Sequence, residues 1–128
     1  MATDTPAPMA PDINAAARAE RDKALAALDA AITAINTQWS GMTPAQKQDA
    51  LKHIGHIGQQ KDAISAAFVD TIFGSQAHRN VISQIADATT AMNAAVKDIK
   101  DTTTALNNAA KILGYAGQIA GLFASLAG

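Results

Sequence analysis

Apolar side chains recur in this chain with alternating spacings of three and four residues, and this spacing constrains the fold more than any other feature. A sustained 3/4 alternation places its members on one narrow stripe of an α-helix, as in coiled-coil seams. No stretch shows the period-two alternation of a β-strand. We therefore predict an all-α, elongated antiparallel helical bundle. The two clearest series are Leu25, Leu28, Ile32, Ile35, Trp39, Met42 and Ile82, Ile85, Thr89, Met92, Val96, Ile99, Thr103, Leu106, Ala110, Leu113.

Two turn signals divide the chain into helices near 12–40, 44–73 and from 76 to the end. At the first, Gly41 suits a left-handed helix terminus, Pro44 suits a first helical position, and Thr43 with Gln46 forms a capping box. At the second, Gly74-Ser75 joins a helix-ending glycine to a capping serine.

Residues 1–11 contain three of the four prolines and almost no bulky apolar side chain, so we expect a disordered leader before a single bundle domain at 12–128. This leader lacks the features of a signal peptide, which favours a cytoplasmic protein or one secreted by a leaderless route.

The element from residue 76 onward admits two interpretations. As one helix of more than 50 residues it would be about 75 Å long. A break at Asp101-Thr102-Thr103-Thr104 would give four helices of similar length, because Asp and Thr favour caps over helix interiors. No Gly or Pro stands there, and the 3/4 series continues through the site without a shift. We favour the break, and thus a four-helix bundle.

The composition excludes several classes of function. The chain has no cysteine, a net charge of −1, three histidines and a single glutamate. Disulfide frameworks and thiolate metal sites are therefore excluded, and the basic surplus of a nucleic-acid binder is missing. Known catalytic motifs are also missing. We expect a protein without enzymatic activity, cofactor or metal.

Residues 112–128 depart from an ordinary bundle helix, because no charged side chain follows Lys111. Seventeen residues are fewer than the roughly 20 that span a bilayer comfortably. At helical spacing, bulky and small residues separate into two groups. Small residues spaced as in Gly-x-x-x-Gly allow two helix backbones to approach closely. The bulky group is Ile112, Tyr115, Ile119, Leu122, Phe123 and Leu126, and the small group is Gly114, Gly117, Ala120, Gly121 and Ala124.

Glycines in a water-exposed helix cost up to about 1 kcal/mol each, so we expect segment 112–128 to be covered by lipid or protein. The predicted function is membrane association, by apolar insertion of the bulky group, or oligomer assembly through the small group. The expected partners are membrane lipid, sister chains or partner helices. The architecture resembles that of small helical pore-forming or toxin-like proteins, which keep an apolar segment covered until contact.

Two histidines, His53 and His56, are three residues apart and share one side of the second predicted helix with Asp49. No further ligand is indicated, so we predict no metal site there. Protonation would place two positive charges beside Gly55 and Gly58, which makes this turn a candidate pH switch.

Trp39-Ser40-Gly41 stands in the turn between the first two helices. This tripeptide resembles the W-x-G turn of the WXG-type small secreted proteins, which are leaderless helical hairpins. The resemblance implies an alternative function as a secreted protein-interaction or structural module. The heptad spacing gives Trp39 another role, as a core anchor that closes one end of the bundle.

Overall fold

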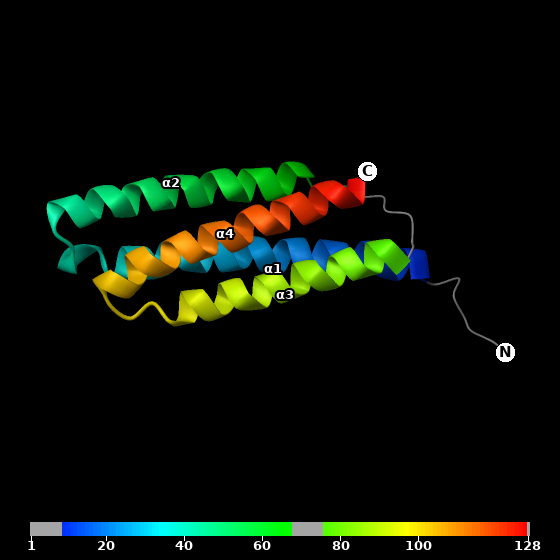
Figure 1. Cartoon of the computed structure of the whole chain (residues 1–128), viewed down its shortest axis with the longest axis horizontal. Helices are drawn as coiled ribbons and strands as arrows, with labels where there is room; N and C mark the ends of the chain where they lie inside the picture. The colour runs from blue at the N-terminus through cyan, green and yellow to red at the C-terminus, as the bar shows by residue number, and fades with distance from the viewer. Residues whose placement is uncertain (1–8, 68–75, 128) are drawn as a thin grey trace.

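The computed structural model describes residues 9–67 and 76–127, which form a bundle of four α-helices without a strand (Figure 1). Helices α1 and α3 run in one direction, and α2 and α4 run in the other. The prediction of an all-α antiparallel bundle is confirmed. The elements are α1 (Met9–Thr37), the 3-10 helix η2 (Trp39–Gly41), α2 (Pro44–Ala67), α3 (Gln76–Lys97) and α4 (Thr102–Ala127).

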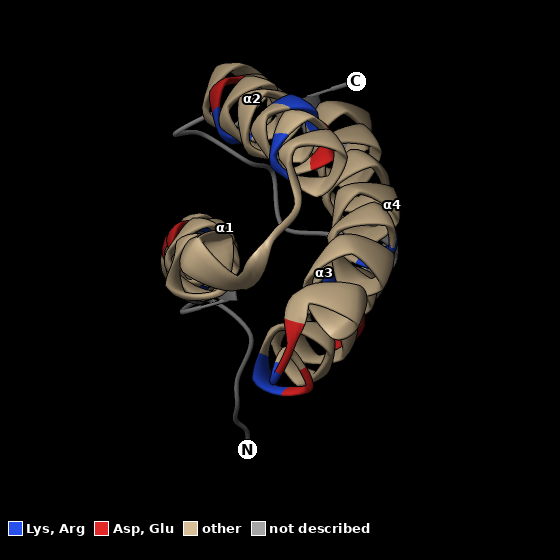
Figure 2. Cartoon of the chain, turned by 90° about the vertical axis from the view of Figure 1, so that its left-hand side faces the viewer, with Lys and Arg blue, Asp and Glu red and all other residues tan. Residues whose placement is uncertain are grey.

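Helix α4 packs against each of the other three helices. Seen along the bundle, α2, α4 and α3 form a curved layer, and α1 lies on its concave side (Figure 2). Helix α4 is thus the middle helix of the layer. The apolar segment that begins at Ile112 is therefore part of the helix that contacts all three others.

The turn between α1 and α2 follows its sequence signals in part. The Thr43 N–H donates to Gln46 Oε1 at 2.9 Å, and the Gln46 N–H donates to Thr43 Oγ1 at 3.2 Å. This confirms the capping box, and Pro44 is the first residue of α2. The prediction for Gly41 is wrong: its φ lies outside the left-handed range. Gly41 is the last residue of η2, and its N–H donates to the carbonyl oxygen of Gln38.

Helices α1 and α3 begin within three residues of their predicted starts. Helix α1 begins at Met9, within the predicted leader, and residues 1–8 lie outside the described residues. Helix α3 begins at Gln76, as expected after the Gly74-Ser75 signal. That signal lies within 68–75, also outside the described residues.

The long third element is broken, as the four-helix interpretation requires. The break lies at residues 98–101, three residues before the predicted 101–104, and Thr102, Thr103 and Thr104 are the first residues of α4. The Asp101 carboxylate accepts the Thr104 N–H at 2.8 Å, and Thr104 Oγ1 accepts the backbone N–H groups of Lys100 and Asp101 at 2.9 and 3.1 Å. These bonds satisfy amides at the start of α4 that lack partners within the helix. The backbone and side-chain bonds from Thr104 lower the pKa of Asp101 below its usual value.

The predicted continuation of the third series through this break is wrong. In α4, Thr103 and Ala110 are exposed, whereas Ala105 and Ala109 are fully buried. The non-helical residues 98–101 rotate α4 relative to α3, so its core stripe occupies different positions. This stripe, the inner face of α4, is Ala105, Ala109, Ile112, Ala116, Ile119 and Phe123.

Alanine supplies much of the core on α1 as well. Ala24 and Ala31 are fully buried with Leu28 and Ile35, whereas Leu25 and Ile32 of the predicted stripe are only half-buried. Small side chains between large ones let helices approach closely while the large ones fill the remaining space. The core of α1 therefore includes buried alanines that the spacing of the bulky residues does not reveal.

Trp39 is half-buried and packs against the core at the α1–α2 end of the bundle. The Lys47 ammonium lies 5.4 Å from the centre of its ring, within the range of a cation–π contact. Trp39 therefore lies where an anchor of this end is predicted, and the residue remains partly exposed.

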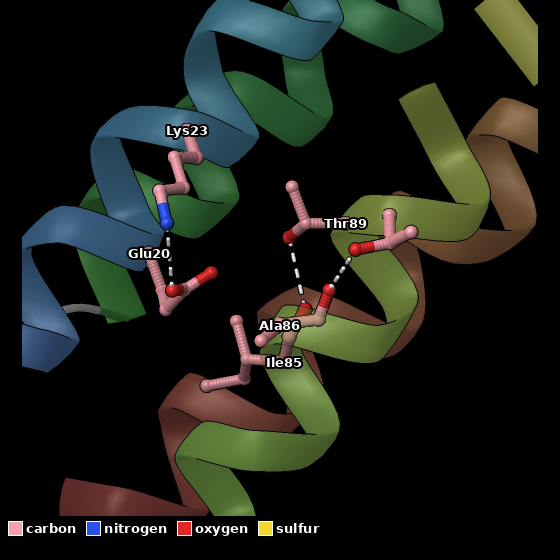
Figure 3. A network of polar contacts seen from close by, with 6 residues as sticks. Glu20, Lys23, Ile85, Ala86 and Thr89 are labelled. Carbon is pink, nitrogen blue, oxygen red and sulfur yellow. Dashed lines mark hydrogen bonds and ion pairs between the residues drawn. The ribbon is translucent and has the colours of Figure 1, made fainter. Parts of the chain in front are cut away.

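Several polar side chains in or near the interior have hydrogen-bond or ion-pair partners in the bundle. Thr89 is 3% exposed, and its hydroxyl donates to the Ile85 carbonyl oxygen at 2.9 Å within α3 (Figure 3). On α1, Lys23 pairs with Glu20 at 3.3 Å, and the Glu20 side chain is 13% exposed (Figure 3). Asn108 of α4 is 6% exposed, and its Nδ2 donates to the Ala95 carbonyl oxygen of α3 at 2.9 Å. This last bond fixes the relative position of the two helices.

Candidate functional site

The bulky residues of segment 112–128 lie largely against the interior. Ile112 and Ile119 are fully buried, and Phe123 is 1% exposed. Tyr115 and Leu122 are half-buried at the edges of this face, and the side chain of Leu126 lies outside the described residues. The residues predicted to insert into lipid therefore contribute to the core of the bundle itself.

The small residues lie on the opposite side. Gly114, Gly117, Gly121 and Ala124 are exposed, and Ala120 is half-buried. A Cβ atom placed on any of these three glycines would meet no neighbouring atom within 4 Å. No intramolecular contact therefore requires glycine at these positions.

One further residue belongs to this surface. Ala110 is exposed and stands four positions before Gly114, so it continues the same 3/4 spacing. Sequence analysis missed it because it assigned Ala110 to the core stripe, and counting backward from Gly114 would have found it. We call this surface the outer face of α4 and define it as Ala110, Gly114, Gly117, Gly121 and Ala124.

Charge also distinguishes α4 from the rest of the bundle. Its one charged residue is Lys111, whereas α1 and α2 carry both acidic and basic side chains (Figure 2). An approaching helix would therefore displace water from apolar and backbone atoms and would desolvate few ions.

The two histidines have different surroundings on α2. His56 is exposed, whereas His53 is half-buried, and its Nδ1 atom is buried without a hydrogen-bond partner. Gly55 and Gly58 have open space where a Cβ would lie. Among the described residues, no three His, Asp or Glu side chains lie close enough together to hold a metal ion. The pH switch stays a prediction.

Within residues 9–67 and 76–127, no helix combines the length and hydropathy needed to cross a bilayer. Comparison with family models, with curated proteins and with solved structures finds no match for this chain. The resemblance to WXG-type proteins therefore depends on Trp39-Ser40-Gly41 alone, which form η2.

Proposed function

We propose that this protein is a non-enzymatic helical assembly subunit that binds a second copy of itself through the outer face of α4. The observation that carries the proposal is an exposed row of glycine and alanine at 3/4 spacing along α4, with open space around Gly114, Gly117 and Gly121. Each glycine costs the exposed helix about 0.8–1.0 kcal/mol relative to alanine, and the monomer gains no close contact in return. A close contact between two molecules would offset this loss of helix stability.

Helix pairing accounts for the residue types on this surface. With glycine at 3/4 spacing, two helix backbones can approach until Cα–H groups of one contact carbonyl oxygens of the other. A second copy of the same flat, uncharged strip is complementary to it, because a two-fold axis brings identical patches together. We therefore infer an isologous contact between two α4 helices.

Membrane association is the competing interpretation of the same segment. Insertion of Ile112, Ile119 and Phe123 into lipid would require these side chains to leave the core. Burying a side chain of this size contributes about 1.5–3 kcal/mol, so the bundle would have to open at considerable cost. Pairing of outer faces leaves the core intact, and for this reason we favour assembly.

The experiment measures the molar mass of the wild type, Gly117→Leu and Gly55→Leu by size-exclusion chromatography with light scattering. Gly55 is the matched control, because it is also an exposed helical glycine with open space around it. We expect the wild type and Gly55→Leu at a multiple of the 13.1 kDa chain mass, and Gly117→Leu at that mass itself.

Thermal melts would confirm that both variants fold. A wild type that stays at 13.1 kDa at every concentration would contradict the proposal, and so would an equal effect of the two substitutions. A monomer that floats with liposomes would favour membrane association instead.

A further inference from the structure

A surface hollow of about 240 Å³ lies between the C-terminal half of α3 and the middle of α4. Three alanines of α3, at positions 91, 94 and 95, are among the residues that line it. The other lining residues are Asp98, Asn108, Lys111 and Tyr115. The hollow is thus lined by small residues on α3 and by residues with polar groups, most of them on α4.

Asn108 ties the two helices together at this hollow. Its Nδ2 donates to the Ala95 carbonyl oxygen at 2.9 Å. This bond uses one of the two amide N–H groups and leaves the amide oxygen as an acceptor for a ligand. With 6% of its surface exposed, Asn108 is held in place by the packing around it. The hollow therefore has at least one polar group in a fixed position.

Residues that carry acceptor and donor groups come from opposite ends of the hollow. Asn108, Lys111 and Tyr115 stand on successive turns of α4, so residues Lys111 and Tyr115 follow Asn108 toward the C-terminus. Helices α3 and α4 are antiparallel (Figure 1), so Asp98, just beyond the end of α3, lies toward the N-terminal part of α4. The carboxylate of Asp98 and the amide oxygen of Asn108 thus share one end.

We propose that this hollow binds a small zwitterion, namely a free α-amino acid with an apolar side chain. Its ammonium group would lie toward Asp98 and Asn108, and its carboxylate would lie toward Lys111 and Tyr115. Its side chain would contact the alanine methyl groups. This proposal does not depend on self-association through the outer face of α4.

Size and exposure set the expected affinity. The volume is below the roughly 300–1,000 Å³ of pockets for drug-sized ligands, which matches an amino acid and is too small for a nucleotide. Asp98 and Lys111 are exposed to water, which weakens ion pairing. We therefore expect a dissociation constant on the order of 1 mM.

The test is a titration of the ¹⁵N-labelled full chain, followed by amide NMR, with L-leucine, N-acetyl-L-leucine and L-leucinamide. We expect L-leucine to shift amides in 91–98 and 108–115 saturably at about 10 mM. Each analogue lacks one charge and should bind about tenfold more weakly, which is the effect of losing one charge-assisted hydrogen bond.

Variants test the assigned groups. Lys111→Met and Asp98→Asn should each weaken L-leucine binding about tenfold, and Ala94→Leu should abolish it by filling the hollow. Lys100→Met and Asp87→Asn, which change exposed charges outside the hollow, should leave binding unchanged. The proposal is overturned by the absence of saturable shifts in these two segments, by equal binding of all three compounds, or by unchanged binding in the first three variants.

Discussion

The inner and outer faces of α4 follow the same 3/4 spacing but differ in what their residues contact. The inner face combines three alanines with Ile112, Ile119 and Phe123, all buried against the other helices. The outer face has glycine or alanine at every position, and its glycines have open space around them. Regular spacing therefore identifies residues that share one side of a helix. It does not predict which of two such sides is buried in the bundle.

Glycine and alanine also act differently on these two faces. Buried Ala105, Ala109 and Ala116 allow close packing and preserve helix propensity. Exposed Gly114, Gly117 and Gly121 permit an even closer approach but lower helix stability. The buried alanines stabilise the single chain, whereas the exposed glycines fit the proposed contact between two molecules.

The largest effect on stability should come from the inner face. Phe123→Ala removes a side chain that is 1% exposed and should lower the free energy of unfolding by about 3–5 kcal/mol. Gln118→Ala, on an exposed position of the same helix, should change it by less than about 0.5 kcal/mol. Urea unfolding followed by circular dichroism measures both, and equal effects would contradict the burial of Phe123 in the core.

A second pair of variants adds bulk in place of removing it. Ala116→Leu should destabilise by about 1–3 kcal/mol, because the fully buried alanine leaves no room for three more carbons. Ala124→Leu on the outer face should be neutral within about 0.5 kcal/mol in dilute solution. The same unfolding measurement applies, and destabilisation by Ala124→Leu would indicate a covered outer face within the monomer.

A smaller effect of opposite sign is expected for glycine replacement. In dilute solution Gly117→Ala should raise the free energy of unfolding by about 0.5–1 kcal/mol, because alanine is the better helix former and meets no neighbour. Gly55→Ala should give the same gain. A loss of stability in Gly117→Ala alone, in thermal melts of dilute samples, would mean that glycine at 117 serves an intramolecular contact.

The smallest effect should be the acid sensitivity of the α4 start. Because hydrogen bonds from Thr104 lower the pKa of Asp101 in the folded state, its carboxylate stabilises the fold above its unfolded pKa of 3.8. This contribution disappears as the pH falls below 3.8 through the folded pKa. Thermal melts should show a slightly smaller loss in acid for Asp101→Asn, since asparagine also caps helices and does not titrate there. Identical acid profiles would contradict this role.

Sequence reasoning succeeded where a few adjacent residues determine the structure. Thr43 and Gln46 bond to each other at the start of α2, whose first residue is Pro44, and Asp101 with Thr104 begins α4 in the same way. These signals are local, so no knowledge of the other helices was needed.

Sequence reasoning failed where the answer depends on how helices face one another. The rotation introduced by residues 98–101 moved the core stripe of α4, and no property of Leu106 or Ala110 alone predicts it. Alanine is also neutral as a signal, because it suits buried and exposed helix positions equally, so Ala24 and Ala31 were missed as core residues. The spacing likewise identified the glycines of the outer face of α4, but it did not predict that they point away from the bundle.

The most direct test uses the absence of cysteine from the chain. Single cysteines introduced at 110, 114, 117, 121 and 124 would be oxidised in dilute solution, with Gly55→Cys as the control. A disulfide requires Cβ atoms about 3.8 Å apart, so it reports the contact itself. We expect rapid disulfide-linked dimers at one or more outer-face positions and slow formation at 55. Formation at 55 as fast as at every outer-face position would contradict pairing through α4.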